Sequence, residues 1–260
     1  MILPIVLAIS ALVTNPAPQA KPPSPDAARI KTALVELKEA FAKPDAGPRI
    51  RAIEGAADIS DADVVRYFGR GLDDKDVSVQ KASIEALRFS AHAKALDELL
   101  ARAKMKAAKD DLPLYAALIR AIGQHEDPRA IEVLTDNLWS APDAQVVQAK
   151  ILGLGRVRTK ESLKALTDLM EVAGPYKMQP FMKDFRLALW SLTGVDQGES
   201  RDLWLRWHRE NKSAVKIQAQ PATEPRELSR RWEQYWAKPG AEGGTEKGRG
   251  RGGRREGGEE

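Results

Sequence analysis

The sequence predicts an all-α protein, a right-handed α-solenoid of about five two-helix repeats with a capping helix at each end. The composition favours helices, because only 6% of the residues are aromatic while Ala, Leu, Lys, Arg and Glu are abundant. A unit of about 34 residues recurs five times. Helix-capping residues recur at fixed distances from each copy. The chain has 260 residues, of which 43% are apolar, enough for a sizeable core.

The first element is an N-terminal leader. Residues 1–20 carry no charge, and the apolar run from Ile2 to Val13 is too short to span a bilayer. This run is typical of a secretory signal, with the small residue Ala20 at its end. We therefore expect export to the periplasm or the medium, with no membrane span in the mature chain. The alternative is an uncleaved anchor on the membrane surface.

A short linker and a first helix follow. Residues 21–25 are rich in proline and form the expected linker. Residues 26–43 form the expected N-terminal capping helix. Its apolar positions recur at helical spacing, so one face can cover the first repeat. These positions are Ile30, Ala33, Leu34, Leu37 and Phe41.

The repeats occupy residues 45–211. Their anchor positions are Ile50, Ile84, Ile119, Ile151 and Leu189, at spacings of 34, 35, 32 and 38 residues. The third position of each copy is small, as in Ala121 and Gly153, and the fourth is apolar. The small residues at the third position let a neighbouring helix approach closely, while the branched residues at the fourth position fill the seam between the helices.

The flanks of the anchors define two helices per unit. Acidic residues stand eight residues before the three middle anchors, where they can cap a first helix: Asp76, Asp111 and Asp143. Capping types also stand eight residues after four anchors, at the start of a second helix: Asp58, His92, Asp127 and Thr159. Each second helix then carries an apolar pair at i, i+3, such as Leu96 and Leu99. Each unit is therefore expected to be two antiparallel helices that bury one seam.

Two segments carry a family resemblance, IRAIGQHEDPRAIEVL and ILGLGRVRTKESLKAL. Both resemble HEAT repeats, especially the short bilin-lyase-type HEAT-like variety. The resemblance covers roughly residues 45–211. It implies an α-solenoid that serves mainly as a binding scaffold and only occasionally as an enzyme. Bilin lyase activity is not implied, because no functional residue of that family matches a position here.

Five of the six tryptophans lie at or beyond position 190. Trp204 occupies a seam position of the fifth unit and is expected in the core. Trp190 occupies a position that is charged in three earlier units, which indicates that another segment covers it. Residues 223–237 are the candidate, since they form an amphipathic helix with an aromatic face. They are expected to cap the last repeat; the alternative is an aromatic ligand site.

The apolar face of this last helix consists of Leu228, Trp232, Tyr235 and Trp236. The ending LTG followed by a Trp-x-x-Trp helix resembles the C-terminal unit of exported bacterial HEAT-like proteins of unknown function.

No catalytic or cofactor site emerges from the sequence. The chain has no Cys, and its three His residues show no metal-ligand spacing. His125 and Glu126 form a single His-Glu dyad, which we interpret as a surface turn rather than a metal site. The sequence therefore predicts a protein that is not an enzyme and holds no cofactor and no metal.

Residues 239–260 form a tail rich in Gly, Arg and Glu whose composition predicts disorder. Five basic residues of this tail could bind a polyanion: Lys247, Arg249, Arg251, Arg254 and Arg255. Five Glu residues balance them, and no aromatic residue is interleaved, so the sequence disfavours nucleic acid. The chain's net charge of +4 identifies no partner. An intracellular nucleic-acid binder that uses this tail remains the competing function.

We expect the partner to be another protein, bound on an inner surface formed by the second helices. The candidate contact residues on those helices are Tyr67, Arg70, Lys104, Asp136, Trp139, Asp168 and Glu171. Trp139 is the large aromatic residue among them, and such residues often anchor interfaces. The alternative is that Trp139 packs against the adjacent repeat. The sequence does not fix the oligomeric state.

Overall fold

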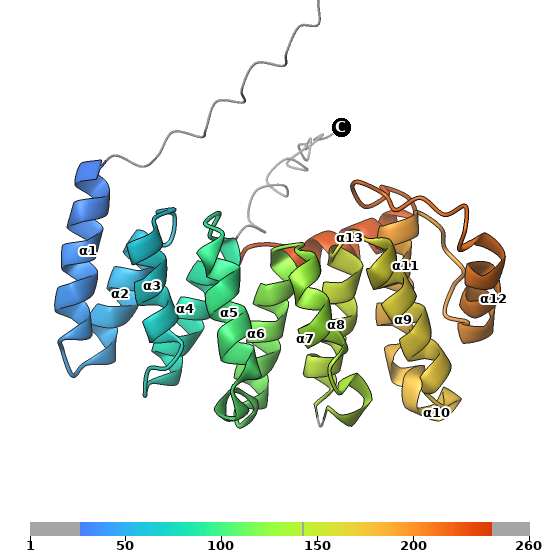
Figure 1. Ribbon diagram of the computed structural model, residues 1–260, viewed down its shortest axis with the longest axis horizontal. Helices are drawn as coiled ribbons and strands as arrows, with labels where there is room; N and C mark the ends of the chain where they lie inside the picture. The colour runs from blue at the N-terminus through green and yellow to red at the C-terminus, as the bar shows by residue number, and fades with distance from the viewer. Residues whose placement is uncertain (1–26, 142, 241–260) are drawn as a thin grey trace, which may run out of the picture.

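The chain folds into two stacked layers of helices, as a computed structural model shows for residues 27–141 and 143–240 (Figure 1). The first layer consists of α2 (Ala46–Ala56), α4 (Val77–Phe89), α6 (Leu112–Gln124), α8 (Ala144–Arg156) and α11 (Met182–Thr193). The second consists of α3 (Ala62–Gly71), α5 (Lys94–Lys104), α7 (Ile131–Thr135), α9 (Lys160–Val172) and α12 (Arg201–Asn211). These described residues contain no strand. The predicted α-solenoid is confirmed.

Capping residues start the helices largely as expected. Asp76, Asp111 and Asp143 accept hydrogen bonds from the first backbone amides of α4, α6 and α8. Thr159 does the same for α9. The prediction for Asp58 is wrong, because α3 is capped by Asp61. Asp58 instead pairs with Arg29 at 2.7 Å, which ties the first helix to the first repeat.

The N-terminal helix α1 (Ala27–Phe41) packs against α2 and α3. Its residues Ala33 and Leu37 are buried in the core of the first repeat. At its C-terminal end, Phe41 contacts Tyr67 of α3 with the ring centroids 5.6 Å apart. α1 therefore covers the free end of the stack, as a capping helix must.

The third repeat departs from the regular pattern. Its second helix begins as the 3-10 turn η2 (Pro128–Ala130), and α7 has only five residues. Asn137 stands in the left-handed region at φ 48°, which ends the helix because Asn tolerates this conformation. The 3-10 turn η3 (Leu138–Ser140) follows. Three further short elements, η1 (Lys106–Lys109), α10 (Pro175–Met178) and η4 (Gln179–Phe181), connect repeats.

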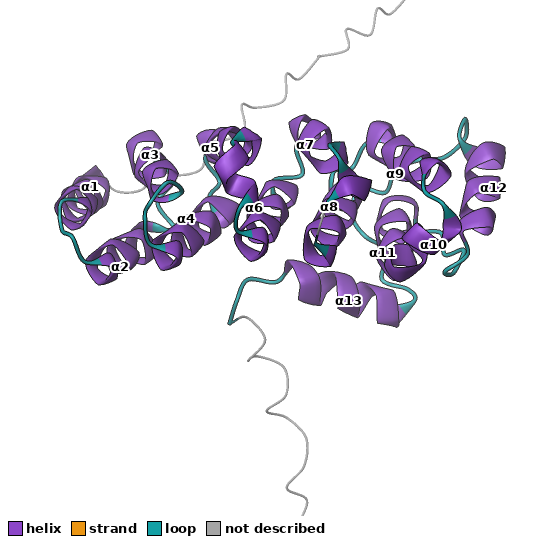
Figure 2. Ribbon diagram, turned by 90° about the horizontal axis from the view of Figure 1, so that it is seen from below, coloured by secondary structure: helices purple, strands orange, loops and turns teal. Residues whose placement is uncertain are grey.

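The two layers arch, and the first helices form the inner side of the arch (Figure 2). This corrects the expectation that the second helices line the inner surface. Glycines let the first helices approach closely: a Cβ on Gly155 of α8 would lie 2.6 Å from the Cα of Ala188 in α11. A Cβ on Gly123 of α6 would lie 2.8 Å from the Cα of Gly153 in α8. Because the first helices pack at such close range, the stack bends toward them.

The last helix, α13 (Arg226–Trp236), lies on the inner side of the arch, next to α8 and α11 (Figure 2). It covers Trp190 as expected: this side chain is fully buried, and its Nε1 donates to the carbonyl of Glu224 at 3.0 Å. However, α13 does not close the free end of the last repeat, where α12 lies (Figure 1). Trp204 of α12 is fully buried, which confirms its place in the core.

Candidate protein-binding surface on the inner layer

The predicted contact residues lie on the second layer, which is the outer side of the arch. Most of their charges are paired with near neighbours: Lys104 with Glu132 at 3.3 Å and Asp136 with Lys109 at 3.5 Å. Asp168 likewise pairs with Lys164. Glu171 is exposed in the last turn of α9. Tyr67 and Arg70 gather with Phe41, the Arg70 guanidinium carbon lying 5.2 Å from each ring centroid. The structure does not bring the set together as one site.

Trp139 packs within the solenoid. Its ring stacks on Phe185 of α11 at 6.0 Å between centroids and tilts against Phe181 at 6.2 Å. Its Nε1 donates to the carbonyl of Leu169 at 3.0 Å. Since the ring contacts Phe181 and Phe185 and its Nε1 has an acceptor, the packing alternative describes Trp139 better than the interface hypothesis.

The inner layer binds a helix, because α13 lies across it. Leu228, Trp232 and Trp236 are each at most 5% exposed and hold α13 against the first helices. The ring of Trp236 reaches α6, where its Cη2 would lie 3.0 Å from a Cβ on Gly123. Gly123 therefore leaves the space that the ring occupies, and α13 spans the third, fourth and fifth repeats.

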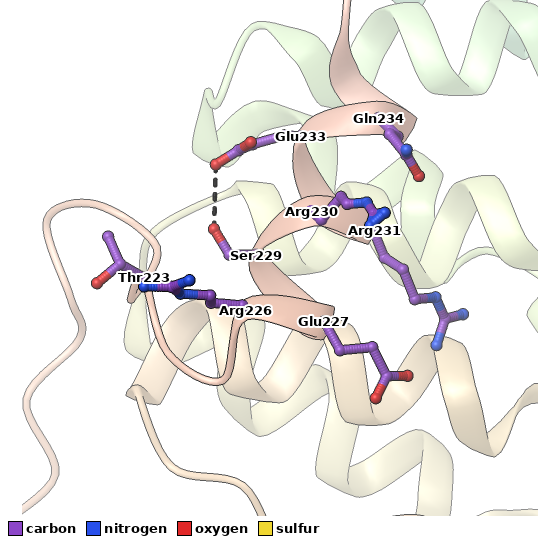
Figure 3. Close-up of a pocket in the computed structure, with 8 residues that line it drawn as sticks. All are labelled: Thr223, Arg226, Glu227, Ser229, Arg230, Arg231, Glu233 and Gln234. Carbon is purple, nitrogen blue, oxygen red and sulfur yellow. Dashed lines mark hydrogen bonds between the residues drawn. The ribbon is translucent and has the colours of Figure 1, made fainter. Parts of the chain in front are cut away.

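The opposite face of α13 points to solvent (Figure 3). It carries the charged and polar side chains Arg226, Glu227, Arg230, Arg231, Glu233 and Gln234, which line an open hollow of about 850 Å³. Ser229 donates to Glu233 at 3.0 Å along the helix. Both signs of charge are present here, which is typical of a solvated helix face and identifies no ligand by itself.

Three arginines of the first helices converge on the C-terminal end of α13. Arg88 of α4 donates from Nη2 to the carbonyl of Trp236 at 3.2 Å. Arg120 of α6 donates to the carbonyl of Tyr235, and its guanidinium carbon lies 4.7 Å from that residue's ring centroid. Arg156 of α8 lies over the ring of Trp236 at 4.9 Å. The last carbonyls of a helix carry partial negative charge, so these cations stabilise the helix end.

Burial shapes the electrostatics of this arginine cluster (Arg88, Arg120 and Arg156). Burial, and secondly the charge of Arg120, lower the pKa of Arg88, whose side chain is fully buried. Burial also lowers the pKa of Arg156. Glu85 and Glu126 partly compensate these two arginines at 3.4 Å and 3.1 Å. Within the described residues, no carboxylate lies within ion-pair distance of Arg120.

The inner layer also has an open, apolar half over the first two repeats. A hollow of about 580 Å³ lies between α2 and α4, and its apolar lining includes Ile50, Ala82 and Phe89. Lys238 and Pro239, which directly follow α13, form one wall. The hollow therefore lies on the same side as α13 and continues the surface that α13 covers. Its charged rim is formed by Glu54, Lys81 and Glu85.

The remaining candidate chemistry has structural explanations. His125 lies in the turn after α6, as expected, but it is half-buried there, and its Nε2 lies 3.0 Å from the carbonyl of Leu87, so it joins the second and third repeats. Burial lowers the pKa of His125. His92 accepts at Nδ1 from the amide of Lys94 at the start of α5. In the described part of the chain, no three His, Cys, Asp or Glu side chains are grouped to hold a metal ion.

Some predictions concern residues outside the described ranges. They include the leader at 1–20, the linker at 21–25 and the polyanion candidates of the tail, Lys247, Arg249, Arg251, Arg254 and Arg255. Among the helices of residues 27–141 and 143–240, none is both long and apolar enough to cross a membrane.

Sequence reasoning missed the arginine cluster. Arg88 stands four residues after its anchor, Arg120 one and Arg156 five, so the repeat alignment shows no common position. A usable signal was the arginine within a helix whose other central residues are apolar, as in IEALRF and ILGLGR.

Comparison with known proteins gives one match. A family model described as HEAT repeats matches residues 34–111 and 105–176, which together cover more than half of the chain. No curated protein matches the sequence.

Proposed function

The chain belongs to the HEAT-repeat family, and from this premise we propose that it binds another protein on the inner layer, with the open half over α2 and α4 as the contact surface. HEAT-repeat chains are helical scaffolds, commonly for protein interaction and generally without catalytic activity. The apolar hollow of about 580 Å³ between α2 and α4 is the observation that carries the proposal. Aliphatic and aromatic side chains at its floor and charges at its rim are typical of protein interfaces.

The adjoining surface supports this choice. The same layer already holds α13 through three large apolar side chains, so its shape and chemistry suit a bound helix. The outer layer offers less, because the charges of Lys104, Asp136 and Asp168 are paired within the chain and Trp139 is packed.

A site-specific photocrosslink tests the binding surface. The chain has no Cys, so Ser78→Cys at the hollow and Asp168→Cys on the outer layer can each carry one benzophenone. In cells that produce the protein, irradiation should join a discrete partner to the Ser78→Cys chain and not to the Asp168→Cys chain. Adducts from the outer position alone would place the partner on the second helices and contradict the proposal, as would adducts from neither.

We also propose that the scaffold is exported. The support is the uncharged apolar leader, residues 1–20. A fusion of residues 1–40 to a phosphatase that is active only outside the cytoplasm should show activity, whereas a matched fusion of residues 21–40 should not. Equal activities would contradict export through this leader.

A further inference from the structure

The contact between α13 and the inner layer leaves polar atoms unsatisfied. Five buried side-chain nitrogens at this contact have no hydrogen-bond partner: the Nε atoms of Arg88, Arg120 and Arg156 and the Nε1 atoms of Trp232 and Trp236. All five are donors. A buried donor without an acceptor destabilises the contact, because it has lost its hydrogen bond to water and gained none in return. The contact therefore lacks acceptor groups.

In addition, α13 does not fill all the space beside it. A half-open hollow of about 310 Å³ lies between α13, the connector residues 220–223 and the end of α8, and its walls include Arg156, Trp232 and Trp236. The helix is joined to α12 by residues 212–225, which contain no helix. This connection is held to α11 at Gln218, whose amide donates to the carbonyl of Leu192 at 2.8 Å, so an exchange of α13 need release only the residues that follow Gln218. A helix that leaves a hollow and unpaired donors at its contact can be displaced by a ligand that fills the hollow and supplies acceptors.

The arginine cluster indicates what the better ligand carries. α13 offers these cations only backbone carbonyls and aromatic faces, through Tyr235 and Trp236. Arg120 has no carboxylate partner in the described structure, although charged hydrogen bonds to carboxylates are roughly twice as strong as neutral ones. A carboxylate at the C-terminal end of a bound helix would reach this cluster.

We propose that the inner surface beneath α13 is a receptor for a partner's amphipathic helix that has an aromatic face and ends in a carboxylate, and that α13 is an exchangeable occupant of it. This inference rests on the proposed function and specifies its partner. Leu228, Trp232 and Trp236 show the apolar pattern that such a helix must present. The arginine cluster sets its direction, with the C-terminal end over α4 and α6.

Two peptides of one sequence test the inference. Both copy residues 224–237 and carry an N-terminal fluorophore; one ends in a free acid and the other in an amide. Each is titrated against the full chain carrying Trp232→Ala, which weakens the docking of α13. We expect the acid peptide to bind about tenfold more tightly, as a charge-assisted bond to Arg120 requires. In the Trp232→Ala chain that also carries Arg120→Gln, the two affinities should come within about twofold.

A second measurement keeps α13 intact. A fluorophore on Ser229→Cys, at a half-exposed position of α13, should gain rotational freedom as the acid peptide displaces the helix. The amide peptide should need about tenfold higher concentration. Circular dichroism establishes that each variant chain remains helical, so that lost binding is not lost folding.

Two results would overturn the inference: equal binding of the acid and amide peptides, or an acid preference that survives Arg120→Gln. Failure of the acid peptide to bind or to displace α13 would overturn it as well. The proposed function fails separately, through the photocrosslink at Ser78. Equal peptide affinities with a Ser78 adduct would reject the carboxylate receptor alone, whereas acid preference without any Ser78 adduct would reject only the open half as the contact surface.

Discussion

Replacing Gly155 with alanine tests whether close packing of the first helices holds the arch. Gly155 lies in α8 and faces α11, where a new Cβ would lie 2.6 Å from the Cα of Ala188 and 2.7 Å from its Cβ. Both of these atoms are fixed to the backbone. No flexible side-chain end can give way, so the two helices must separate.

Two opposing effects set the magnitude. Alanine in place of glycine within a helix stabilises it by about 0.5–1 kcal/mol. Overpacking a well-packed core costs about 1–3 kcal/mol. The clash at Gly155 involves backbone atoms, which places it at the upper end of that range. We therefore expect Gly155→Ala to lower the free energy of unfolding by about 2 kcal/mol, the upper cost of about 3 kcal/mol less a helix gain of up to about 1 kcal/mol.

Gly55 supplies the matched control. It lies in α2, is exposed, and a Cβ there would meet nothing within 4 Å. Gly55→Ala should therefore stabilise the chain, by about 0.5 kcal/mol near the helix end. Urea denaturation followed by far-ultraviolet circular dichroism measures both variants. If Gly155→Ala is as stable as the unchanged chain, close helix approach does not constrain the inner layer and the explanation of the arch is wrong.

Three further predictions concern packing, pH and the last helix. Trp139→Ala should lower stability by about 2–4 kcal/mol in urea, because its ring stacks on Phe185, and should leave the photocrosslinking pattern unchanged. If the Trp139→Ala chain kept its full stability but no longer crosslinked to the partner, Trp139 would instead be an interface anchor. Burial lowers the pKa of Lys150 from 10.5 to about 8, so between these values the unfolded chain binds more protons and stability rises with pH. Lys150→Met should remove this rise in urea midpoints; a flat profile in the unchanged chain would contradict the assignment. Deleting residues 213–260 should lower the melting temperature by exposing the surface under α13, whereas deleting 241–260 should not. Equal melting temperatures would show that α13 contributes no stability.

The repeats could be predicted from the sequence because each stacked unit needs the same types of residue at the same positions. Asp76, Asp111 and Asp143 recur at one distance from their anchors, and each caps a first helix. Trp204 could be assigned to the core because earlier units hold leucine at its position. A residue that serves the stack reappears in each unit, so alignment of the units is enough to find it.

Irregular features that occur in one repeat alone could not be predicted by aligning the units. Asp58 and Asp61 are both capping types, and only the path of the chain decides that Asp61 caps α3 while Asp58 meets Arg29. The left-handed Asn137 shortens α7 without any break in the apolar pattern. The assignment of the inner layer was wrong although a signal existed: the glycines Gly123 and Gly155 let the first helices pack closely, and the closer layer lies inside a bend.

The position of α13 depends on residues that the repeat does not require. An amphipathic face predicts that a helix is covered but not by which surface, and both the end of the stack and its inner side are candidate surfaces. Arg88, Arg120 and Arg156 decide between them, because all three meet the last turn of α13. Stacking does not account for Arg88 and Arg156, since no other unit has an arginine at the same distance from its anchor and burial lowers the pKa of both. Arg88 and Arg156 have no arginine at the corresponding position of another unit, so they serve the contact with α13 rather than the stacking of the repeats.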